Sequence, residues 1–233
     1  MFNSKMKAIT FSYDDGVTQD RRLIDIFNRY GLKATFNINS ELLGNSNTLI
    51  RNDYTIAHCK PRPCEIAKIY DGHEVAVHTL THPNLAELTD EKEIIRQVVS
   101  DKKNLSELVG YDVLGMAYPG GGVNYTHDVA EIIRKNSDIK YARTTVCSGN
   151  FELQDNLLEF KPTVYHMNWG EMFKLADEFL SLKTDSPKLF YIWGHSYEFD
   201  FDNTWGRMEE FCKMISGRDD IFYGTNLEVL SDN

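Results

Sequence analysis

The chain lacks long apolar runs and basic clusters. No stretch approaches the about 18–20 consecutive apolar residues of a membrane span, and residues 1–16 carry no apolar signal-peptide core. We therefore expect no membrane partner and a cytoplasmic location for the sequence as given. The 25 basic residues stand against 35 acidic ones, a formal net charge of −10 at pH 7. Since no basic run exceeds Arg21-Arg22, we expect no nucleic-acid partner, and a neutral substrate is favoured.

Cysteine is scarce, and the glycine motifs of nucleotide-binding proteins are missing. The four cysteines are too widely spread for a zinc knuckle, so we expect reduced thiols at Cys59, Cys64, Cys147 and Cys212. No GxGxxG motif follows the first predicted strand and no GxxxxGK[ST] motif occurs, which argues against dinucleotide and P-loop sites. Without repeats or linkers, the 233 residues fit one domain, 1–233, that needs no disulfides to fold.

Apolar residues alternate along the chain between the spacing of strands and the spacing of helices. The predicted strands are 7–14, 33–38, 74–78, 112–118, 139–145, 189–195 and 221–225, with 160–166 as a short extra strand. The predicted helices are 23–30, 64–70, one that runs from the N-cap Thr89 to about 109, 126–135, 171–182 and 205–215. Residues 45–63 are polar and predict a surface excursion. Strands that alternate with helices indicate a parallel sheet, either in an incomplete (β/α) barrel or in an open doubly wound sheet.

Unusual polar residues gather where the predicted strands end. Asp14 and Asp15 end the first strand, His78 ends the third, residues 119–122 follow the fourth, and His195 ends the sixth. In a parallel sheet or barrel, these carboxyl ends lie on one face, where active sites are built. We therefore expect these side chains to share one site.

Two of these motifs carry donor atoms that are typical of metal sites. Adjacent carboxylates on an extended chain point in opposite directions, so one of Asp14 and Asp15 can bind a metal while the other addresses substrate or water. His78 and His82 are four residues apart, which brings two imidazoles together in a turn. Two imidazoles and one carboxylate form a ligand set of catalytic zinc sites. For each motif alone, a turn-capping aspartate or unrelated histidines are the alternative interpretation.

His195 is the candidate general acid, because histidine titrates near neutral pH. Strand alternation places Trp193 on the same side as an apolar wall. A hydrogen-bonded core histidine is the alternative. Among the other histidines, His166 is kept as a minor site candidate, whereas His58 is assigned to the surface excursion.

Four motifs resemble, in this order, those of the polysaccharide deacetylases, the family 4 carbohydrate esterases with a NodB-homology domain. They are Tyr13-Asp14-Asp15-Gly16, His78-Thr79-Leu80-Thr81-His82, Tyr118-Pro119-Gly120-Gly121 and Trp193-Gly194-His195. The resemblance implies an α/β fold, a distorted (β/α)7 barrel. It also implies metal-dependent removal of acetyl groups from amino sugars.

The same resemblance implies roles for individual residues. Asp14 resembles the catalytic base and His195 the catalytic acid. The implied metal ligands are Asp15, His78 and His82. The expected substrate contacts are Tyr118, Pro119, Gly120 and Trp193. The expected cofactor is Zn²⁺, although nitrogen and oxygen ligands also accept Co, Ni, Mn or Fe.

The third and fourth motifs depart from the family pattern. The family usually has an Arg two positions before the third-motif Pro and an aromatic residue after it, where this chain has Ala117 and Gly120. The fourth motif, an Asp-containing strand that ends in Trp, has no obvious counterpart. Alternation in the strand 139–145 allows Arg143 to face inward, where a buried guanidinium needs a carboxylate. We hypothesise that Arg143 makes a bidentate pair with Asp14 and so replaces the missing Arg. An outward-facing Arg143 is the alternative.

Three functions fit these observations. The first is a metal-dependent deacetylase of an N-acetylated sugar. The second is a metal-dependent hydrolase of a small non-sugar amide on the same fold. The third is a non-catalytic metal-binding or carbohydrate-binding protein, against which the presence of both Asp14 and His195 argues. The patterns predict neither an oligomeric state nor the linkage of a substrate.

Overall fold

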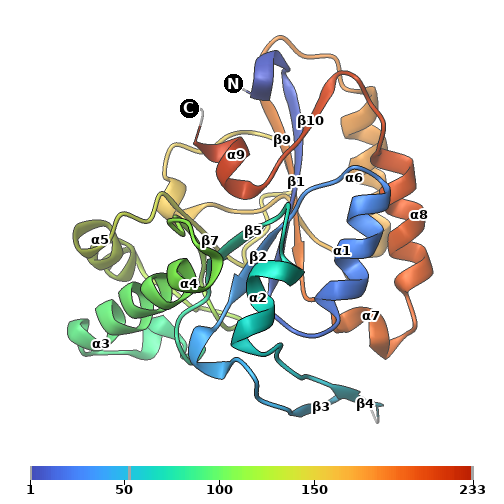
Figure 1. Ribbon diagram of the computed structural model, residues 1–233. Helices are drawn as coiled ribbons and strands as arrows, with labels where there is room; N and C mark the ends of the chain where they lie inside the picture. The colour runs from blue at the N-terminus through green and yellow to red at the C-terminus, as the bar shows by residue number, and fades with distance from the viewer. Residues whose placement is uncertain (1, 52–53, 232–233) are drawn as a thin grey trace.

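The computed structural model describes residues 2–51 and 54–231 and is built around a curled parallel sheet (Figure 1). The strand order is β7-β6-β5-β2-β1-β9-β8, and β10 also pairs with β1. Every ladder of this sheet is parallel. Its strands are β1 (Lys7–Asp14), β2 (Thr35–Ile38), β5 (Glu74–Val77), β6 (Gly115–Ala117), β7 (Tyr141–Arg143), β8 (Val164–Tyr165), β9 (Lys188–Gly194) and β10 (Ile221–Tyr223).

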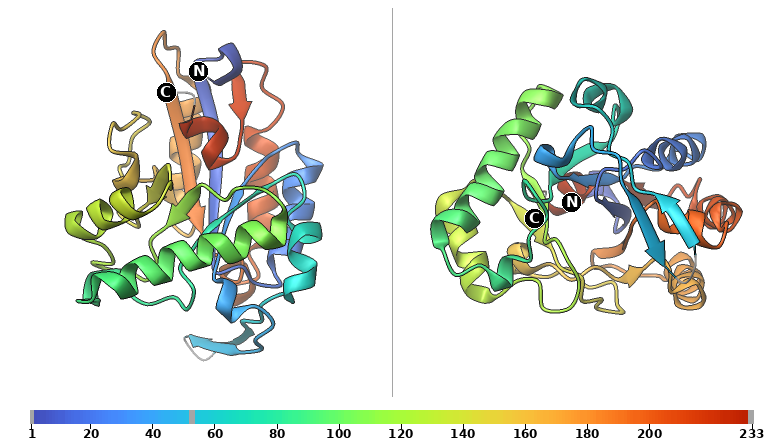
Figure 2. Two further views of the ribbon diagram at one scale, coloured as in Figure 1. Left: turned by 60° about the vertical axis from the view of Figure 1, so that its left-hand side comes forward. Right: turned by 90° about the horizontal axis from the view of Figure 1, so that it is seen from below.

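In the view from below, helices lie outside the strands on most sides of the molecule (Figure 2). The α-helices are α1 (Asp20–Arg29), α2 (Ile66–Ile69), α3 (Glu91–Ile95), α4 (Asp101–Val109), α5 (His127–Asn136), α6 (Trp169–Ser181), α7 (Glu198–Phe201), α8 (Trp205–Ile215) and α9 (Asn226–Leu230). The short turns of helix are η1 (Phe2–Ser4), η2 (Ser40–Leu42), η3 (Pro63–Glu65), η4 (Leu85–Glu87), the π turn η5 (Arg96–Ser100) and η6 (Leu157–Glu159). The main apolar core packs between the sheet and these helices. Among the described residues, none of the helices combines the length and the apolar character that a membrane crossing requires.

An irregular segment, rather than a full strand, closes the barrel between the edge strands β7 and β8. Phe160 forms an isolated parallel bridge with Arg143. The amide of Thr144 donates to the carbonyl of Phe160, and the amide of Phe160 donates to the carbonyl of Ala142. This closure confirms the distorted (β/α) barrel and decides against the open doubly wound sheet.

The predicted elements are present, with changed bounds and some additions. The strand 7–14 and the helix 205–215 match β1 and α8, whereas the strand 112–118 shrinks to β6. The helix predicted from Thr89 is a run of α3, η5 and α4, and its N-cap is Asp90, whose side chain accepts from the amide of Lys92. The excursion 45–63 contains an unpredicted antiparallel hairpin of β3 (Thr48–Arg51) and β4 (Tyr54–Ala57). Because most hairpin residues are exposed, no buried face marks it in the sequence.

The two ends of the barrel differ. Helix α9 covers the end from which the strands start, where the carboxylate of Glu74 accepts the amide of Leu227 at 2.9 Å. At the same end, the hydroxyl of Thr10 lies 2.8 Å from Oδ1 of Asn226. Both chain termini lie there, and the β3–β4 hairpin lies at the other end (Figure 1). The carboxyl ends of the strands therefore form the face that is available for a site.

Candidate active site

A cavity of about 370 Å³ opens at the carboxyl ends of the strands. Its lining residues are Asp14, Asp15, His78, His82, Gly120, Gly121, Gly122, Thr145, Trp193, His195 and Tyr197. The sequence therefore placed the two aspartates and three histidines of the candidate site correctly on one face.

Asp15, His78 and His82 form a cluster with the geometry of a metal site. Their donor atoms all lie within 4.8 Å of one another, and no other such group of three occurs among the described residues. Oδ1 of Asp15 is 3.8 Å from Nε2 of His78 and 3.4 Å from Nε2 of His82. Two ligands bound at about 2.1 Å in a tetrahedral arrangement lie about 3.4 Å apart. The two distances from Asp15 are therefore close to the separation that ligands of one cation have.

The turns that carry these ligands have a strained backbone. Asp15, Thr79 and His82 have φ angles of 80°, 66° and 63°, in the left-handed region that residues other than glycine rarely adopt. Asp15 follows the last residue of β1, and Thr79 and His82 lie in the loop after β5. Strain of this kind persists only where the surrounding structure holds it, which is typical of functional sites.

His78 carries a buried nitrogen that suits a cation. Its Nδ1 lies 2.9 Å from the carbonyl of Ala117, which only accepts, so Nδ1 carries the proton. Its Nε2 is buried and has no hydrogen-bond partner. Burial lowers the pKa of His78 to about 4, so the imidazole is neutral at pH 7. A buried acceptor without a partner is costly, and a cation on Nε2 would satisfy it. The residues present thus fit a divalent metal ion.

Asp14 lies beside this cluster and is held by two side chains. Nη2 of the fully buried Arg143 donates to both oxygens of Asp14. Nδ2 of Asn37 donates to Oδ1 of Asp14 at 2.8 Å. Burial has the largest single effect and would raise the pKa of Asp14, but the neighbouring charges, with Arg143 first, together outweigh burial, and the pKa lies below its ordinary value. Asp14 is therefore an oriented carboxylate that is ionised at neutral pH.

The register of the sheet explains how Arg143 reaches Asp14. Arg143 pairs directly with Ala117, so both side chains leave the sheet on the same side. The guanidinium also stacks over the Trp193 ring at 4.6 Å. Arg143 faces inward onto Asp14, although it uses one nitrogen where we expected a two-nitrogen fork. Its role in turnover stays a prediction.

His195 is anchored by a carboxylate that the sequence analysis did not identify. Oε2 of Glu198 lies 3.1 Å from Nδ1 of His195 and 3.2 Å from its amide nitrogen. Nε2 of His166 lies 2.8 Å from the same oxygen, and the hydroxyl of Tyr165 donates to Oε1. Burial has the largest single effect and would lower the pKa of His195, but the charge and hydrogen bond of Glu198, together with the charges of Asp15 and Asp14, outweigh it and raise the pKa to about 9. His195 is therefore an imidazolium at pH 7, and its Nε2 lies 4.0 Å from Asp14.

Two of the four predicted substrate contacts do not line the cavity. Gly120 and Trp193 lie in its wall. Tyr118 and Pro119 are buried behind it, and the hydroxyl of Tyr118 donates to the carbonyl of Leu158 at 2.9 Å. The prediction for Tyr118 did not account for strand alternation, which turns its ring away from the cavity.

The assignment of His58 to a surface excursion is wrong. Its side chain is 15% exposed, and its Nε2 lies 3.2 Å from Oδ2 of Asp15. No local signal marks this contact, because it joins two segments through a hairpin. Glu198 does have a signal, since it follows His195 by three residues, the spacing of one helical turn. His166 lies behind Glu198, away from the cavity wall.

Gly194 is required by the packing behind His195. A Cβ atom at this position would lie 2.2 Å from the ring of His166. We expect Gly194→Ala to displace His166 and to lower the free energy of unfolding by about 1–3 kcal/mol, measured by denaturant titration. A Cβ atom at Gly206, in α8, would point into open space, so Gly206→Ala is the matched control and should not destabilise. Equal stability of the two variants would contradict this account.

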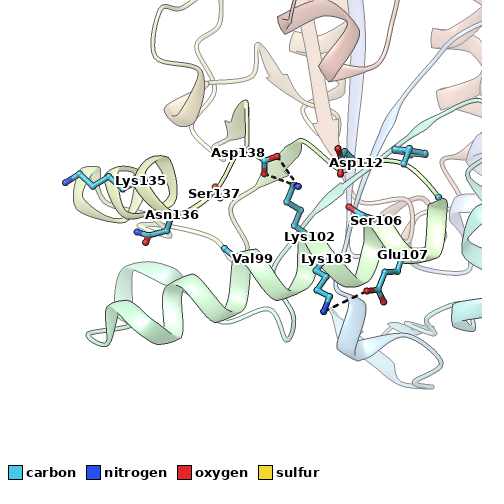
Figure 3. Close-up of a pocket in the computed structure, with 12 residues that line it drawn as sticks. Val99, Lys102, Lys103, Ser106, Glu107, Asp112, Lys135, Asn136, Ser137 and Asp138 are labelled. Atoms are coloured by element: carbon cyan, nitrogen blue, oxygen red, sulfur yellow. Dashed lines mark hydrogen bonds and ion pairs between the residues drawn. The ribbon is translucent and has the colours of Figure 1, made fainter.

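A second hollow, of about 1020 Å³, lies between α4 and α5 (Figure 3). Four of its charged residues form ion pairs, since Lys102 contacts Asp138 at 2.9 Å and Lys103 contacts Glu107 at 4.0 Å. It lies where β6 and β7 begin, which is the opposite end of the strands from the candidate site. This groove contains no histidine or cysteine and offers no comparable chemistry.

Comparison with known proteins extends the motif resemblance. The family model for polysaccharide deacetylase matches residues 3–137, more than half of the chain. No curated protein matches the sequence. Among solved structures, a T48 deacetylase with substrate gives a TM-score of 0.61 at 14% identity, over 100% of this chain and 94% of that chain. A peptidoglycan N-acetylglucosamine deacetylase in complex with an N-hydroxybenzamide gives 0.58 at 17% identity, over 98% and 89%.

A third solved structure is similar to the same extent. A family 4 acetyl xylan esterase from Clostridium thermocellum in complex with a cobalt ion gives a TM-score of 0.58 at 13% identity, over 97% of this chain and 91% of that chain. At such identities the structural likeness shows the fold alone. The matched residues 3–137 include Asp14, Asp15, His78 and His82, and they end before Arg143 and His195.

Proposed function

The chain is a hydrolase that belongs to the polysaccharide deacetylase family, and we propose that it removes the acetyl group from an N-acetylated amino sugar or oligosaccharide with a divalent metal ion. One observation carries the proposal. The donors of Asp15, His78 and His82 converge in the cavity that also holds Asp14 and His195. Hydrolysis of an amide needs an activated water, a polarised carbonyl and a proton for the leaving amine, and these groups supply all three.

Asp15, His78 and His82 would hold the metal, for which we propose Zn²⁺. A divalent ion in such a site lowers the pKa of a bound water and polarises the acetyl carbonyl. Two nitrogen ligands and one oxygen ligand suit zinc and leave positions open, although Co, Ni, Mn or Fe would be accepted as well.

Asp14 acts as the general base in this proposal. Its carboxylate takes a proton from the water as the water oxygen attacks the acetyl carbon. Arg143 and Asn37 fix the carboxylate so that it keeps one orientation in the cavity. The resulting tetrahedral carbon carries the former water oxygen, and Asp14 carries the proton.

His195 acts as the general acid. Its Nδ1–H is held by Glu198, so Nε2–H is the proton that faces the cavity. As the bond between the carbonyl carbon and the nitrogen breaks, Nε2–H protonates the leaving nitrogen. The products are a free amine and acetic acid, which ionises to acetate. Asp14 then releases its proton to solvent and His195 takes one up, so both groups return to their starting states.

A small non-sugar amide is the second candidate substrate. The wall formed by Gly120, Gly121 and Gly122 bears no side chains where the family usually has an aromatic residue, and the cavity measures only about 370 Å³. The test compares acetate release from three substrates. N-acetylglucosamine oligomers represent a sugar amide, N-alkylacetamides represent a small amide, and acetylated xylan represents a sugar ester.

Removal of the metal is expected to abolish acetate release, and added Zn²⁺ is expected to restore it. Loss of a residue that only hydrogen-bonds to a metal ligand typically weakens metal binding by roughly 10–100-fold. Because His82 is itself a proposed ligand, His82→Ala should weaken metal binding by more than that. The His82 side chain is 34% exposed, so the variant should stay folded. Isothermal titration with Zn²⁺ and an acetate assay test both statements. Full activity after exhaustive chelation would contradict the proposed metal dependence.

A further inference from the structure

The segment 58–60, which follows β4, contacts Asp15 through the side chains of His58 and Lys60. Nε2 of His58 lies 3.2 Å from Oδ2 of Asp15, whereas the two ligand histidines face Oδ1. The ring of Tyr197 packs edge-on against His58, with ring centroids 5.0 Å apart. The two oxygens of Asp15 thus have different histidine neighbours, and Nζ of Lys60 lies 4.0 Å from Oδ1.

This segment is fixed to the loop after β1 by several hydrogen bonds. The ammonium group of Lys60, which is 7% exposed, donates to the main-chain carbonyl of Asp15. The amide of Thr18 donates to the carbonyl of Cys59 at 2.8 Å. The side-chain amide of Gln19 donates to the carbonyl of Ala57 at 2.7 Å. The hydrogen bonds of the neighbouring residues 57, 59 and 60 therefore fix the main chain that carries His58.

We propose that His58 is a positioning residue of the metal centre, which donates Nε2–H to Oδ2 of Asp15 and so presents Oδ1 alone to the cation. This inference rests on the proposed function, because it needs a metal on Asp15. His58 is not part of the donor group whose atoms lie within 4.8 Å of one another, so it acts through Asp15.

The hydrogen bond has a defined effect on the ligand. A carboxylate can bind a metal through one oxygen or through both, and hydrogen bonds to ligating carboxylates fix their orientation. With Oδ2 occupied by His58, Asp15 is held ready to bind through one oxygen, and fewer conformations are lost when the metal arrives. Loss of His58 frees the carboxylate to rotate and to use both oxygens.

The test measures Zn²⁺ affinity of the metal-free proteins by competition with a chromophoric chelator. His58→Ala is expected to weaken Zn²⁺ binding by about 10–100-fold. His58→Gln keeps an N–H donor and is expected to recover most of the affinity. His127, on α5, has a side chain that is 70% exposed and contacts Glu159, so His127→Ala is the matched control with unchanged affinity.

A second measurement reports the coordination directly. The visible absorption of bound Co²⁺ weakens as its coordination number rises, so His58→Ala is expected to give a weaker spectrum than the wild type and His58→Gln. Thermal unfolding of each metal-free variant checks that the fold is retained.

Two results would overturn this inference and leave the proposed function intact. The first is a wild-type Zn²⁺ affinity in His58→Ala. The second is a Zn²⁺ affinity of His58→Gln as low as that of His58→Ala, which would assign the effect to packing of the ring. A wild-type protein that binds no Zn²⁺ or Co²⁺ overturns the proposed function as well. Because affinity is measured without turnover, the two failures are distinguishable.

Discussion

Asp14→Asn is expected to lower kcat by about 10²–10⁴ while the metal content stays unchanged. The amide keeps the shape of the carboxylate but cannot take a proton from the attacking water. Asp14 makes no contact that holds the proposed metal, since the donors are Asp15, His78 and His82. Steady-state acetate release and metal analysis by atomic emission measure the two quantities. Wild-type kcat in this variant would rule out Asp14 as the base.

The buried partner of Asp14 provides the control for this experiment. Arg143 and Asp14 have side chains only 0% and 3% exposed, so removing either charge leaves the other buried and costs about 3–5 kcal/mol of stability. Arg143→Ala should therefore lower both stability and kcat with the metal retained. The double variant Asp14→Asn/Arg143→Leu removes both charges and should recover stability without recovering activity. Recovery of both would assign the loss to instability.

Much of this site follows from the sequence because of one property of parallel sheets. Residues at the carboxyl ends of different strands meet at one face wherever they lie in the chain, so Asp14, His78 and His195 could be placed together. The same reasoning reached Arg143, since adjacent parallel strands in register point equivalent residues to one side. Its partner then followed from the cost of an unpaired buried guanidinium.

The contacts that the sequence did not predict come from irregular segments. His58 reaches Asp15 because a mostly exposed hairpin returns to the loop after β1, and its position depends on the Lys60 and Cys59 contacts. Glu198 begins α7, which has four residues and too little periodicity to predict. His58 is placed by tertiary hydrogen bonds that have no sequence period, whereas Glu198 is marked in the sequence only by its spacing of three residues from His195.

Glu198→Gln is expected to shift the alkaline limb of the kcat profile to lower pH. Burial favours the neutral form of His195, and Glu198, which has the largest effect in the other direction, overcomes burial together with Asp15 and Asp14 and raises the pKa to about 9. A general acid acts only while protonated, so the raised pKa keeps it active through neutral pH and activity is lost as pH rises through about 9. Without the carboxylate charge, this pKa should fall to its ordinary value near 6.5 or lower.

The expected size of this effect follows from the protonated fraction. A pKa of about 9 leaves His195 mostly protonated at pH 8, whereas a pKa near 6.5 lowers that fraction roughly 30-fold. The kcat at pH 8 should fall accordingly, while kcat at pH 6 changes much less. Profiles from pH 5 to 10 at saturating Zn²⁺ measure the shift, and the metal is present in both proteins.

Glu209→Gln is the matched control for the lost charge, because Glu209 lies on α8 in an exposed pair with Arg29. Its profile should overlay the wild type, and His195→Ala should lose the alkaline limb altogether. A profile of Glu198→Gln that keeps the wild-type limb but lies lower at every pH would mean that Glu198 only supports the fold. A shifted limb means that its charge sets the acidity of His195, which no purely structural role produces.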